Sequence, residues 1–136
     1  VHGTGLYDVD YQVDRLRAIR SAAEDHRVPV FINARTDVFL KADDGIDHAV
    51  LLDEVLARGA AYKAAGADGF FVPGLKDKKL IKEICDRTTL PVNVMISGHL
   101  KDIRELADLG VARISFGPTP YIKVAGDLEN SARVFA

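Results

Sequence analysis

Short apolar runs alternate with longer segments of mixed polarity along the chain. The runs that predict strands are Val28 to Asn33, Gly69 to Val72, Pro91 to Met95 and Arg113 to Phe116. Each is apolar nearly throughout, which is typical of strands covered on both faces and therefore of a parallel sheet. The pattern predicts parallel strands that are neighbours in sequence order, with helices on one outer side.

The segments between these runs carry apolar residues at three- and four-residue steps, which predicts amphipathic helices. We expect Asp77 and Thr119 to be N-caps, with Pro120 in a first turn, and Gly66 and Gly110 to end helices. The predicted inward positions, helix by helix, are Val9, Val13, Leu16, Ile19 and Ala23; Leu51, Val55 and Tyr62; Leu80, Ile81 and Ile84; Ile103, Leu106 and Ala107; and Tyr121, Val124, Ala125, Leu128 and Phe135.

Alternating strands and helices admit two architectures, a β/α barrel or a doubly wound open sheet. A closed barrel needs about 250 residues, and this chain has 136. The chain therefore predicts about half a barrel, with residues 1–136 forming a single fragment. Because the open edges of such a sheet leave backbone groups unpaired, we expect the other half to come from a larger parent protein or from another chain. The abrupt start at Val1 agrees with a fragment. The open flavodoxin-like sheet is the alternative. Such a sheet usually carries a phosphate-binding loop after its first strand, but residues 34–37 contain no glycine.

Composition narrows the function classes. Hydrophobic residues make up 48% of the chain, charged residues 28%, and the net charge is -2, as in ordinary globular proteins. Without a basic excess we expect no nucleic-acid partner, and the apolar runs are too short to span a membrane. We expect a cytoplasmic protein, in agreement with its single cysteine, Cys85, which excludes an intramolecular disulfide.

Polar residues appear where the first apolar run ends. Residues two apart in a strand share a face, so Phe31, Asn33, Arg35 and Asp37 should lie together while Ile32 and Ala34 face the helices. In parallel β/α proteins the carboxyl end of the strands faces the active site. The fork of donors on arginine suits a carboxylate or phosphate, and Asp37 could orient it or accept a proton. An Arg-Asp pair that only closes the strand end is the other interpretation.

The segment 34–37, Ala-Arg-Thr-Asp, resembles the fourth strand of the phosphoenolpyruvate mutase and isocitrate lyase superfamily. The stretches 60–74, 90–95 and 106–117 resemble its fifth unit, sixth strand and seventh unit, in the right order. The resemblance implies an α/β fold, a partial (β/α)8 TIM barrel with strands four to seven and their helices. It also implies a homo-oligomer that exchanges a C-terminal helix.

The resemblance implies an enzyme, a Mg2+-dependent lyase or phosphonomutase that acts on small oxo or hydroxy carboxylic acids. Such reactions pass through an enolate, and they break a carbon-carbon bond or rearrange a carbon-phosphorus bond. Arg35 matches the arginine that binds the substrate carboxylate. Asn93, expected at the end of the sixth strand, could donate to a substrate oxygen or cap the strand. The catalytic candidates are therefore Arg35 and Asp37, and the substrate-binding candidates are Arg35 and Asn93.

Some expected features are missing from the chain. The acidic metal-binding motifs and the cysteine-bearing lid of the superfamily precede the segments found here, so no metal ligand is assigned and the isolated fragment should be inactive. Cys85 lies on a helix beside Ile81 and Ile84, where a small core residue is the better interpretation. Where branches that cleave methylisocitrate carry a glutamate, this chain has Gly74, which argues against that substrate.

Two alternatives stay open. The stretch 115–120 leads from a strand into a helix, which in many barrels is a phosphate-binding corner. Pro118 and Pro120 remove two donors there, so a simple helix start is favoured over a phosphate-binding barrel enzyme. The other alternative is a non-catalytic barrel fragment or assembly module in which Arg35 and Asp37 have structural roles only.

Overall fold

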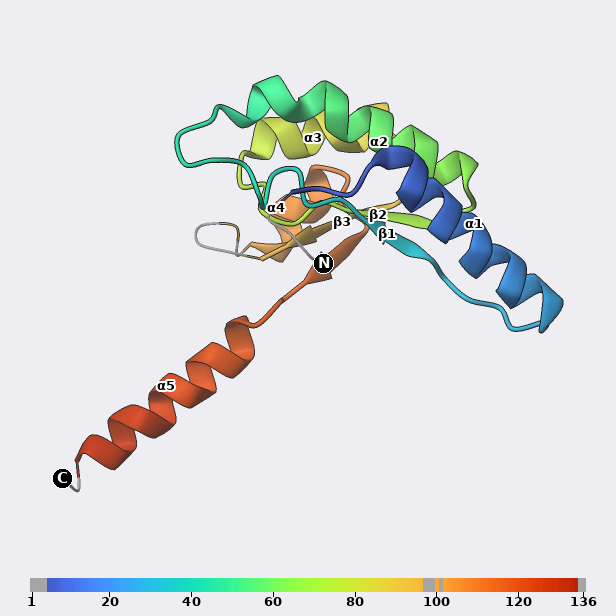
Figure 1. Cartoon of the computed structure of the whole chain (residues 1–136). Helices are drawn as coiled ribbons and strands as arrows, with labels where there is room; N and C mark the ends of the chain where they lie inside the picture. Colours follow the sequence, from blue (N-terminus) through green and yellow to red (C-terminus); the bar gives the residue numbers. More distant parts are fainter. Residues whose placement is uncertain (1–4, 97–99, 101, 135–136) are drawn as a thin grey trace.

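The computed structural model describes residues 5–96, 100 and 102–134. Figure 1 shows the chain alternating between helices and short strands, and it ends in a long helix that projects from the rest. No helix within the described residues is both long enough and apolar enough to cross a membrane. The elements are α1 (Val9–Asp25), β1 (Asn33–Arg35), η1 (His48–Leu51), α2 (Leu52–Ala64), β2 (Gly69–Phe71), α3 (Lys78–Arg87), β3 (Val92–Met95), α4 (Ile103–Asp108), β4 (Arg113–Ser115) and α5 (Thr119–Arg133).

The strands form one parallel sheet in the order β1-β2-β3-β4. This confirms the predicted order and direction. The first strand was predicted too early, because β1 covers only Asn33–Arg35 and pairing with β2 begins at Asn33. Val28, Val30 and Phe31 stay exposed before it. Apolar side chains alone do not make a strand when no neighbouring strand is present to pair with the backbone.

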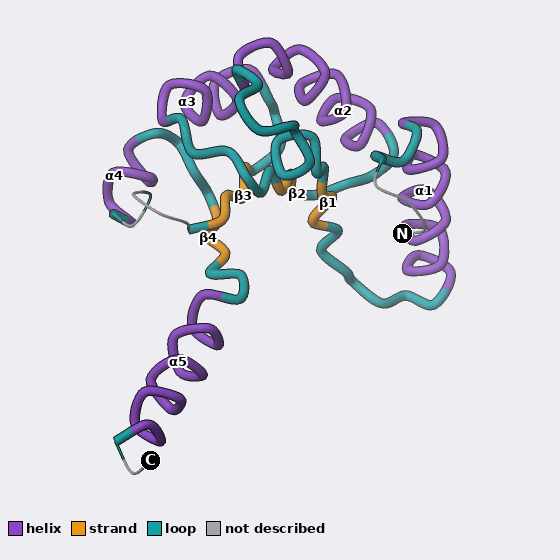
Figure 2. The backbone as a smooth tube through the Cα atoms, turned by 60° about the vertical axis from the view of Figure 1, so that its left-hand side comes forward, coloured by secondary structure: helices purple, strands orange, loops and turns teal. Residues whose placement is uncertain are grey.

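The helices α1 to α4 lie along one side of the sheet and follow its curvature, as the arc in Figure 2 shows. The core lies between these helices and the sheet. It contains Phe70, Val92 and Val94 from the strands, all buried against the helices. Alternate residues of a strand point to opposite faces, so these three positions define the helix-facing side of the sheet.

The helix ends predicted at Asp77, Gly66 and Gly110 are confirmed. The Asp77 carboxylate accepts hydrogen bonds from the backbone N–H groups of Lys79 and Leu80, at 2.7 and 3.1 Å, at the start of α3. Gly66 and Gly110 follow α2 and α4 with φ of 95° and 94°. Glycine suits the left-handed conformation because it has no Cβ to clash with the backbone.

The predicted inward face of α5 is wrong. Within the described residues, Tyr121, Val124, Ala125 and Leu128 are all exposed, and the helix extends away from the sheet (Figure 1); Phe135 lies outside the described residues. The N-cap is Pro118 rather than Thr119. Periodicity shows that one face of a helix favours burial, but it does not show which surface covers that face.

Two positions of α4 also differ from the prediction. Leu106 is buried as expected, whereas Ile103 and Ala107 are exposed. The helix has only 6 residues, and with 3.6 residues in a turn so short a helix brings few positions against the sheet.

Candidate functional site

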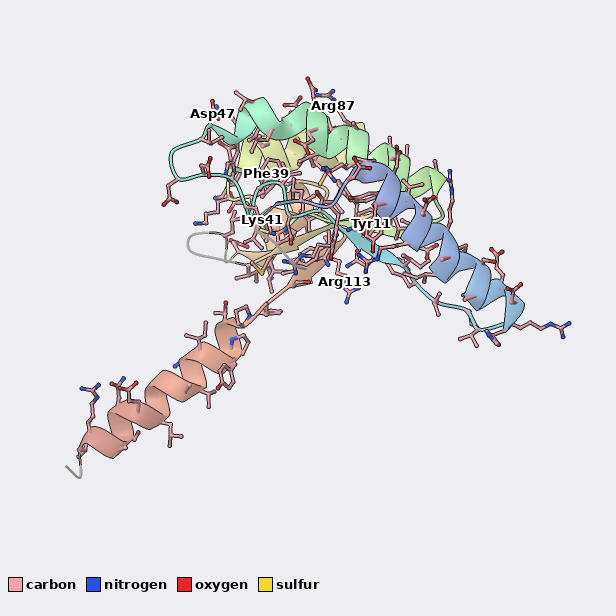
Figure 3. All side chains as sticks on the ribbon, in the orientation of Figure 1. Tyr11, Phe39, Lys41, Asp47, Arg87 and Arg113 are labelled. Atoms are coloured by element: carbon pink, nitrogen blue, oxygen red, sulfur yellow. The ribbon has the colours of Figure 1, made fainter. Side chains whose placement is uncertain are left out.

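A row of inner-face residues crosses all of the strands on the side away from the helices. Arg35 pairs in register with Phe71, Phe71 with Asn93, and Asn93 with Arg113. Residues in register on neighbouring strands share a face, and the helix-facing residues Ala34, Phe70, Val92 and Val94 occupy the alternate positions. Figure 3 shows Arg113 on the side of the sheet opposite α2 and α3.

The Arg35 side chain is fixed from two directions. Its Nε donates a hydrogen bond to the Asp37 carboxylate at 2.5 Å, and its guanidinium lies over the Phe71 ring, 5.5 Å from the centroid. An arginine stacked on an aromatic ring loses little further freedom when it binds a ligand. Its two terminal nitrogens make no hydrogen bond within the described part of the chain. They are the donors suited to a planar anion.

Asn93 is almost completely buried, but not at a strand end. It is the second residue of β3, so the expected position at the carboxyl end, and with it the strand-end cap, is wrong. The side-chain oxygen of Asn93 accepts a hydrogen bond from the Ser115 hydroxyl at 3.1 Å. This contact orients the amide and leaves its nitrogen without a partner among the described residues. That N–H2 group is available to an oxygen atom placed on the inner face.

The inner face is hollowed and carries positive charge. A hollow of about 700 Å³ is lined by Arg35, Arg113 and Phe71, and by 114–118 from the end of β4. A second hollow of about 390 Å³ lies on the helix side, between the end of β1 and the helices α1 and α2; it shares Arg35 and is also lined by Arg15, Lys41 and Arg58, and Arg58 is paired with Glu54. Among the described lining residues of both hollows, Asp37 is the only carboxylate. A concave surface with this excess of cations attracts anions.

One further polar group borders the smaller hollow. Thr36 is buried, and its hydroxyl oxygen has no hydrogen-bond partner among the described residues. Thr36 sits between Arg35 and Asp37 in the chain and lines the same hollow as both. A buried hydroxyl without a partner costs free energy unless a ligand or water satisfies it.

The structure therefore brings the predicted candidates to one face. Arg35 and Asp37 are in contact, and Asn93 lies two strands away in the same row. Arg113 is not among the predicted site residues. The available signal was a charged residue two positions before Ser115 in an otherwise apolar strand, because alternation places both residues on the inner face.

The surroundings of Cys85 favour a structural role. Cys85 is half-buried on α3 and packs close to Gly110. Burial raises the pKa of its thiol, which leaves it neutral and agrees with the structural interpretation.

No group of three or more His, Cys, Asp or Glu side chains within the described residues could hold a metal ion. These residues do not by themselves fit a magnesium site.

Comparison with known proteins places this fold. The sequence profile named "Phosphoenolpyruvate phosphomutase" matches residues 1–136. An oxaloacetate decarboxylase of Ectopseudomonas mendocina is 32% identical over 122 residues, which is 87% of this chain and 38% of the relative. An uncharacterized protein of Mycobacterium tuberculosis is 37% identical over 107 residues, 78% of this chain and 39% of that protein.

Solved structures agree with this placement. A protein of Burkholderia cenocepacia, provisionally described as a phosphonomutase, has a TM-score of 0.90 and 47% identity, and covers 96% of this chain and 52% of its own. A 2,3-dimethylmalate lyase has the same fold, with a TM-score of 0.76 at 21% identity over 93% of this chain and 44% of its own. The chain thus spans about half the length of these proteins, or less. Its sheet and outer helices are part of a (β/α)8 barrel, and the chain belongs to the phosphoenolpyruvate phosphomutase family.

Proposed function

We propose that the full-length protein is a lyase or mutase that acts on a small oxo or hydroxy carboxylic acid through an enolate. The observation that carries the proposal is Arg35, held between Asp37 and Phe71 at a cationic hollow. Relatives described as oxaloacetate decarboxylases support the same class of substrate. Oxaloacetate is an oxo acid, and it loses a carboxyl group when a carbon-carbon bond breaks.

Arg35 binds the substrate carboxylate in this proposal. The two terminal nitrogens of its guanidinium donate in parallel to the two oxygens of the carboxylate, a geometry that a lysine cannot reproduce. Asp37 holds Nε and thereby sets the plane of the fork. Phe71 covers one face of the guanidinium. The substrate is therefore positioned before any bond breaks, which lowers the entropic part of the barrier.

Asn93 stabilises the charge that develops during the reaction. When the carbon-carbon or carbon-phosphorus bond breaks, negative charge grows on the oxygen of the oxo group as the enolate forms. The Asn93 amide, oriented by Ser115, donates to that oxygen. Removing one positioned donor of this kind costs about 2.7 to 4 kcal/mol of transition-state stabilisation in other enzymes.

The magnesium ion implied by the family resemblance would add positive charge at the same oxygen. Because the described residues offer no cluster of ligands for it, we derive no step through a metal. The remaining parts of the proposal are a cytoplasmic location and assembly as a homo-oligomer. The exposed apolar side chains of α5, among them Tyr121 and Leu128, support a covering surface elsewhere in the protein or its assembly.

The surroundings of Gly74 support the expectation that methylisocitrate is a poor substrate. It follows β2 with φ of 89°, and a Cβ at this position would approach the Leu40 Cα and backbone nitrogen to 2.7 Å. A glutamate therefore fits here only if the loop after β1 moves. We expect the full-length protein to turn over methylisocitrate far more slowly than a simple oxo acid such as oxaloacetate. Similar values of kcat/KM for the two substrates would contradict this expectation.

Kinetics and stability of Arg35→Lys, measured together, test the proposed function. The variant keeps the charge and loses the fork, so kcat/KM on the oxo acid should fall by about 2 to 4 kcal/mol of transition-state stabilisation. The thermal midpoint should change little, because the side chain is half exposed. Arg104→Lys is the control, since this exposed arginine on α4 makes no ion pair among the described residues.

Two outcomes would contradict the proposal. Unchanged turnover by Arg35→Lys, or a loss explained wholly by unfolding, would leave Arg35 a structural residue. Absence of turnover of any short oxo or hydroxy acid by the full-length protein would favour a non-catalytic assembly module instead.

A further inference from the structure

Residues 38–40 form a turn directly after Asp37, the carboxylate that holds Arg35. One side of this turn is part of the core, because Phe39 is buried and its ring packs against the His48 ring with 5.1 Å between the centroids. Burial of the ring fixes the backbone that carries it, so the turn has a defined position. The proposed function gives the turn no role.

The other side of the turn rests on Gly74, in the loop after β2. The φ of Gly74 is 89°, in the left-handed region. A Cβ at this position would come within 2.7 Å of both the backbone nitrogen and the Cα of Leu40, and within 2.9 Å of the carbonyl carbon of Phe39. These are backbone atoms, which cannot rotate away as a side chain can. A larger residue therefore displaces the whole turn, and glycine lets the turn approach the end of β2.

The turn, rather than the sheet, sets the position of the Asp37 carboxylate. The backbone ladder extends to Thr36, whose N–H donates to the Phe71 carbonyl at 3.0 Å. Asp37 lies beyond this ladder contact, and its carbonyl accepts the N–H of Lys41 at 2.9 Å, across the turn. Its carboxylate accepts the Nε–H of Arg35 at 2.5 Å. A contact this short weakens when the turn moves, because hydrogen-bond strength falls with distance and misalignment.

We propose that Gly74 is a positioning residue for the Arg35 clamp. By accepting the Leu40 backbone it seats the turn, and the seated turn holds the Asp37 carboxylate against Nε of Arg35. The inference rests on the proposed function, because it takes Arg35 as the group that binds the substrate carboxylate. When the turn shifts, Arg35 keeps its charge but samples more orientations, so the substrate is less well aligned for reaction.

A double-mutant cycle tests this inference, measured as kcat/KM on oxaloacetate with the full-length protein. Gly74→Ala and Asp37→Asn should each lower kcat/KM about tenfold. If both act by loosening Arg35, the double variant loses the interaction once and should also fall about tenfold, whereas independent effects multiply to about a hundredfold. Multiplied losses in the double variant, or unchanged kcat/KM in Gly74→Ala, would overturn the positioning role.

The matched control is Gly45→Ala, in the connection between β1 and η1. The φ of Gly45 is 87°, and a Cβ there meets no atom of the described residues within 4 Å. This variant has the backbone strain of Gly74→Ala without the displaced turn, so kcat/KM should stay within about twofold. An equal loss in the two variants would overturn the inference, because strain alone would then account for the effect.

The NMR signal of the Arg35 Nε–H group reports the same contact without a substrate. Its disappearance in Arg35→Lys assigns the signal. Gly74→Ala should move the signal toward its position in Asp37→Asn. Phe39→Leu loosens the buried side of the turn and should move the signal in the same direction by a smaller amount. If Gly74→Ala does not fold, Phe39→Leu decides, and an unmoved signal there overturns the inference.

The inference and the proposed function fail in different ways. If the full-length protein turns over no oxo or hydroxy acid but the Arg35 signal moves as expected, the proposed function is wrong and the turn still positions Arg35. If oxaloacetate is turned over but the signal does not move in folded Gly74→Ala, the proposed function stands and Gly74 has a structural role only.

Discussion

The two faces of the same four strands carry different chemistry. On the helix-facing side Ala34, Phe70, Val92 and Val94 are buried and apolar. On the other side the register aligns Arg35, Phe71, Asn93 and Arg113. One strand therefore contributes to the core and to the candidate site through neighbouring residues, as Phe70 and Phe71 do within β2.

The difference shows how a parallel sheet separates stability from binding. Helices exclude water from one face, so a charged side chain there would pay a large desolvation cost. The other face can hold charges at fixed spacing because the backbone ladder, not the side chains, sets their positions. Substitutions on the helix-facing side should therefore change the free energy of unfolding, and substitutions on the inner face should change binding.

The largest effect is expected from Phe70→Ala. Phe70 is fully buried against α2, with its ring edge-on to Tyr62 at 6.2 Å between centroids. Removing the ring leaves a cavity and should lower the free energy of unfolding by about 3 to 5 kcal/mol. Phe71→Ala is the matched control on the inner face and should cost less than about 1 kcal/mol. Urea denaturation measures both; equal losses would show that the inner face is also core.

The next effect concerns Gly74, where the loop after β1 crosses the end of β2. A Cβ here meets the Leu40 backbone at 2.7 Å, and φ is 89°. Gly74→Ala should lower the free energy of unfolding by about 2 to 4 kcal/mol, from the left-handed backbone and the clash together. Gly45→Ala separates the two causes, because φ is 87° and nothing lies within 4 Å of the added Cβ; it should cost about 1 kcal/mol. If the two variants lose the same stability, the contact with Leu40 is not tight.

A smaller effect, on activity alone, is expected from Asp37→Asn. The amide still accepts a hydrogen bond from Arg35 but without the charge that strengthens it. We expect kcat/KM on an oxo acid to fall roughly tenfold, about 1.4 kcal/mol, and the thermal midpoint to stay within about one degree. Asp14→Asn, in the exposed pair with Arg17 on α1, is the control for charge removal. A loss of stability without a loss of activity would assign Asp37 to the structure only.

The smallest effect tests the segment that leads into β1. The Asp68 carboxylate accepts hydrogen bonds from the Ile32 backbone N–H at 2.8 Å and from Arg20. These contacts lower its pKa, with the Ile32 N–H as the main cause. We expect Asp68→Asn to lower the free energy of unfolding by about 1 kcal/mol at pH 7, a value reduced by solvent exposure.

The contribution of the Asp68 charge to stability depends on pH. Because the pKa of Asp68 is lower in the folded protein, its stabilising effect is fully present above the unfolded value of about 3.9. It is lost as the pH falls through the folded pKa. Denaturation at pH 7 and at pH 3 should therefore show a smaller difference between Asp68→Asn and the unaltered protein at the lower pH. A constant difference would mean that the Asp68 charge does not contribute.

The sequence predicted the sheet because local signals and tertiary packing agree there. The apolar runs that became β2, β3 and β4 are bounded by caps and by glycines such as Gly66 and Gly110, which specify turns locally. The same holds for Arg35 and Asp37, since alternation along one strand places them together. Prediction was weaker at 28–33 and in α5, because the pairing of an edge strand and the covering of a projecting helix depend on partners that local sequence does not name.

The amino-acid sequence by itself determined the order of the strands, the helix ends at Gly66, Asp77 and Gly110, and the shared face of Arg35 and Asp37, because these follow from periodicity, capping and alternation over a few residues. Only the tertiary structure decided that Asn93 lies within a strand rather than at its end, and that Arg113 joins Arg35 in one row. Register between strands is set by backbone pairing and by packing of the opposite face. Neither can be inferred from the local sequence around the residues that lie side by side.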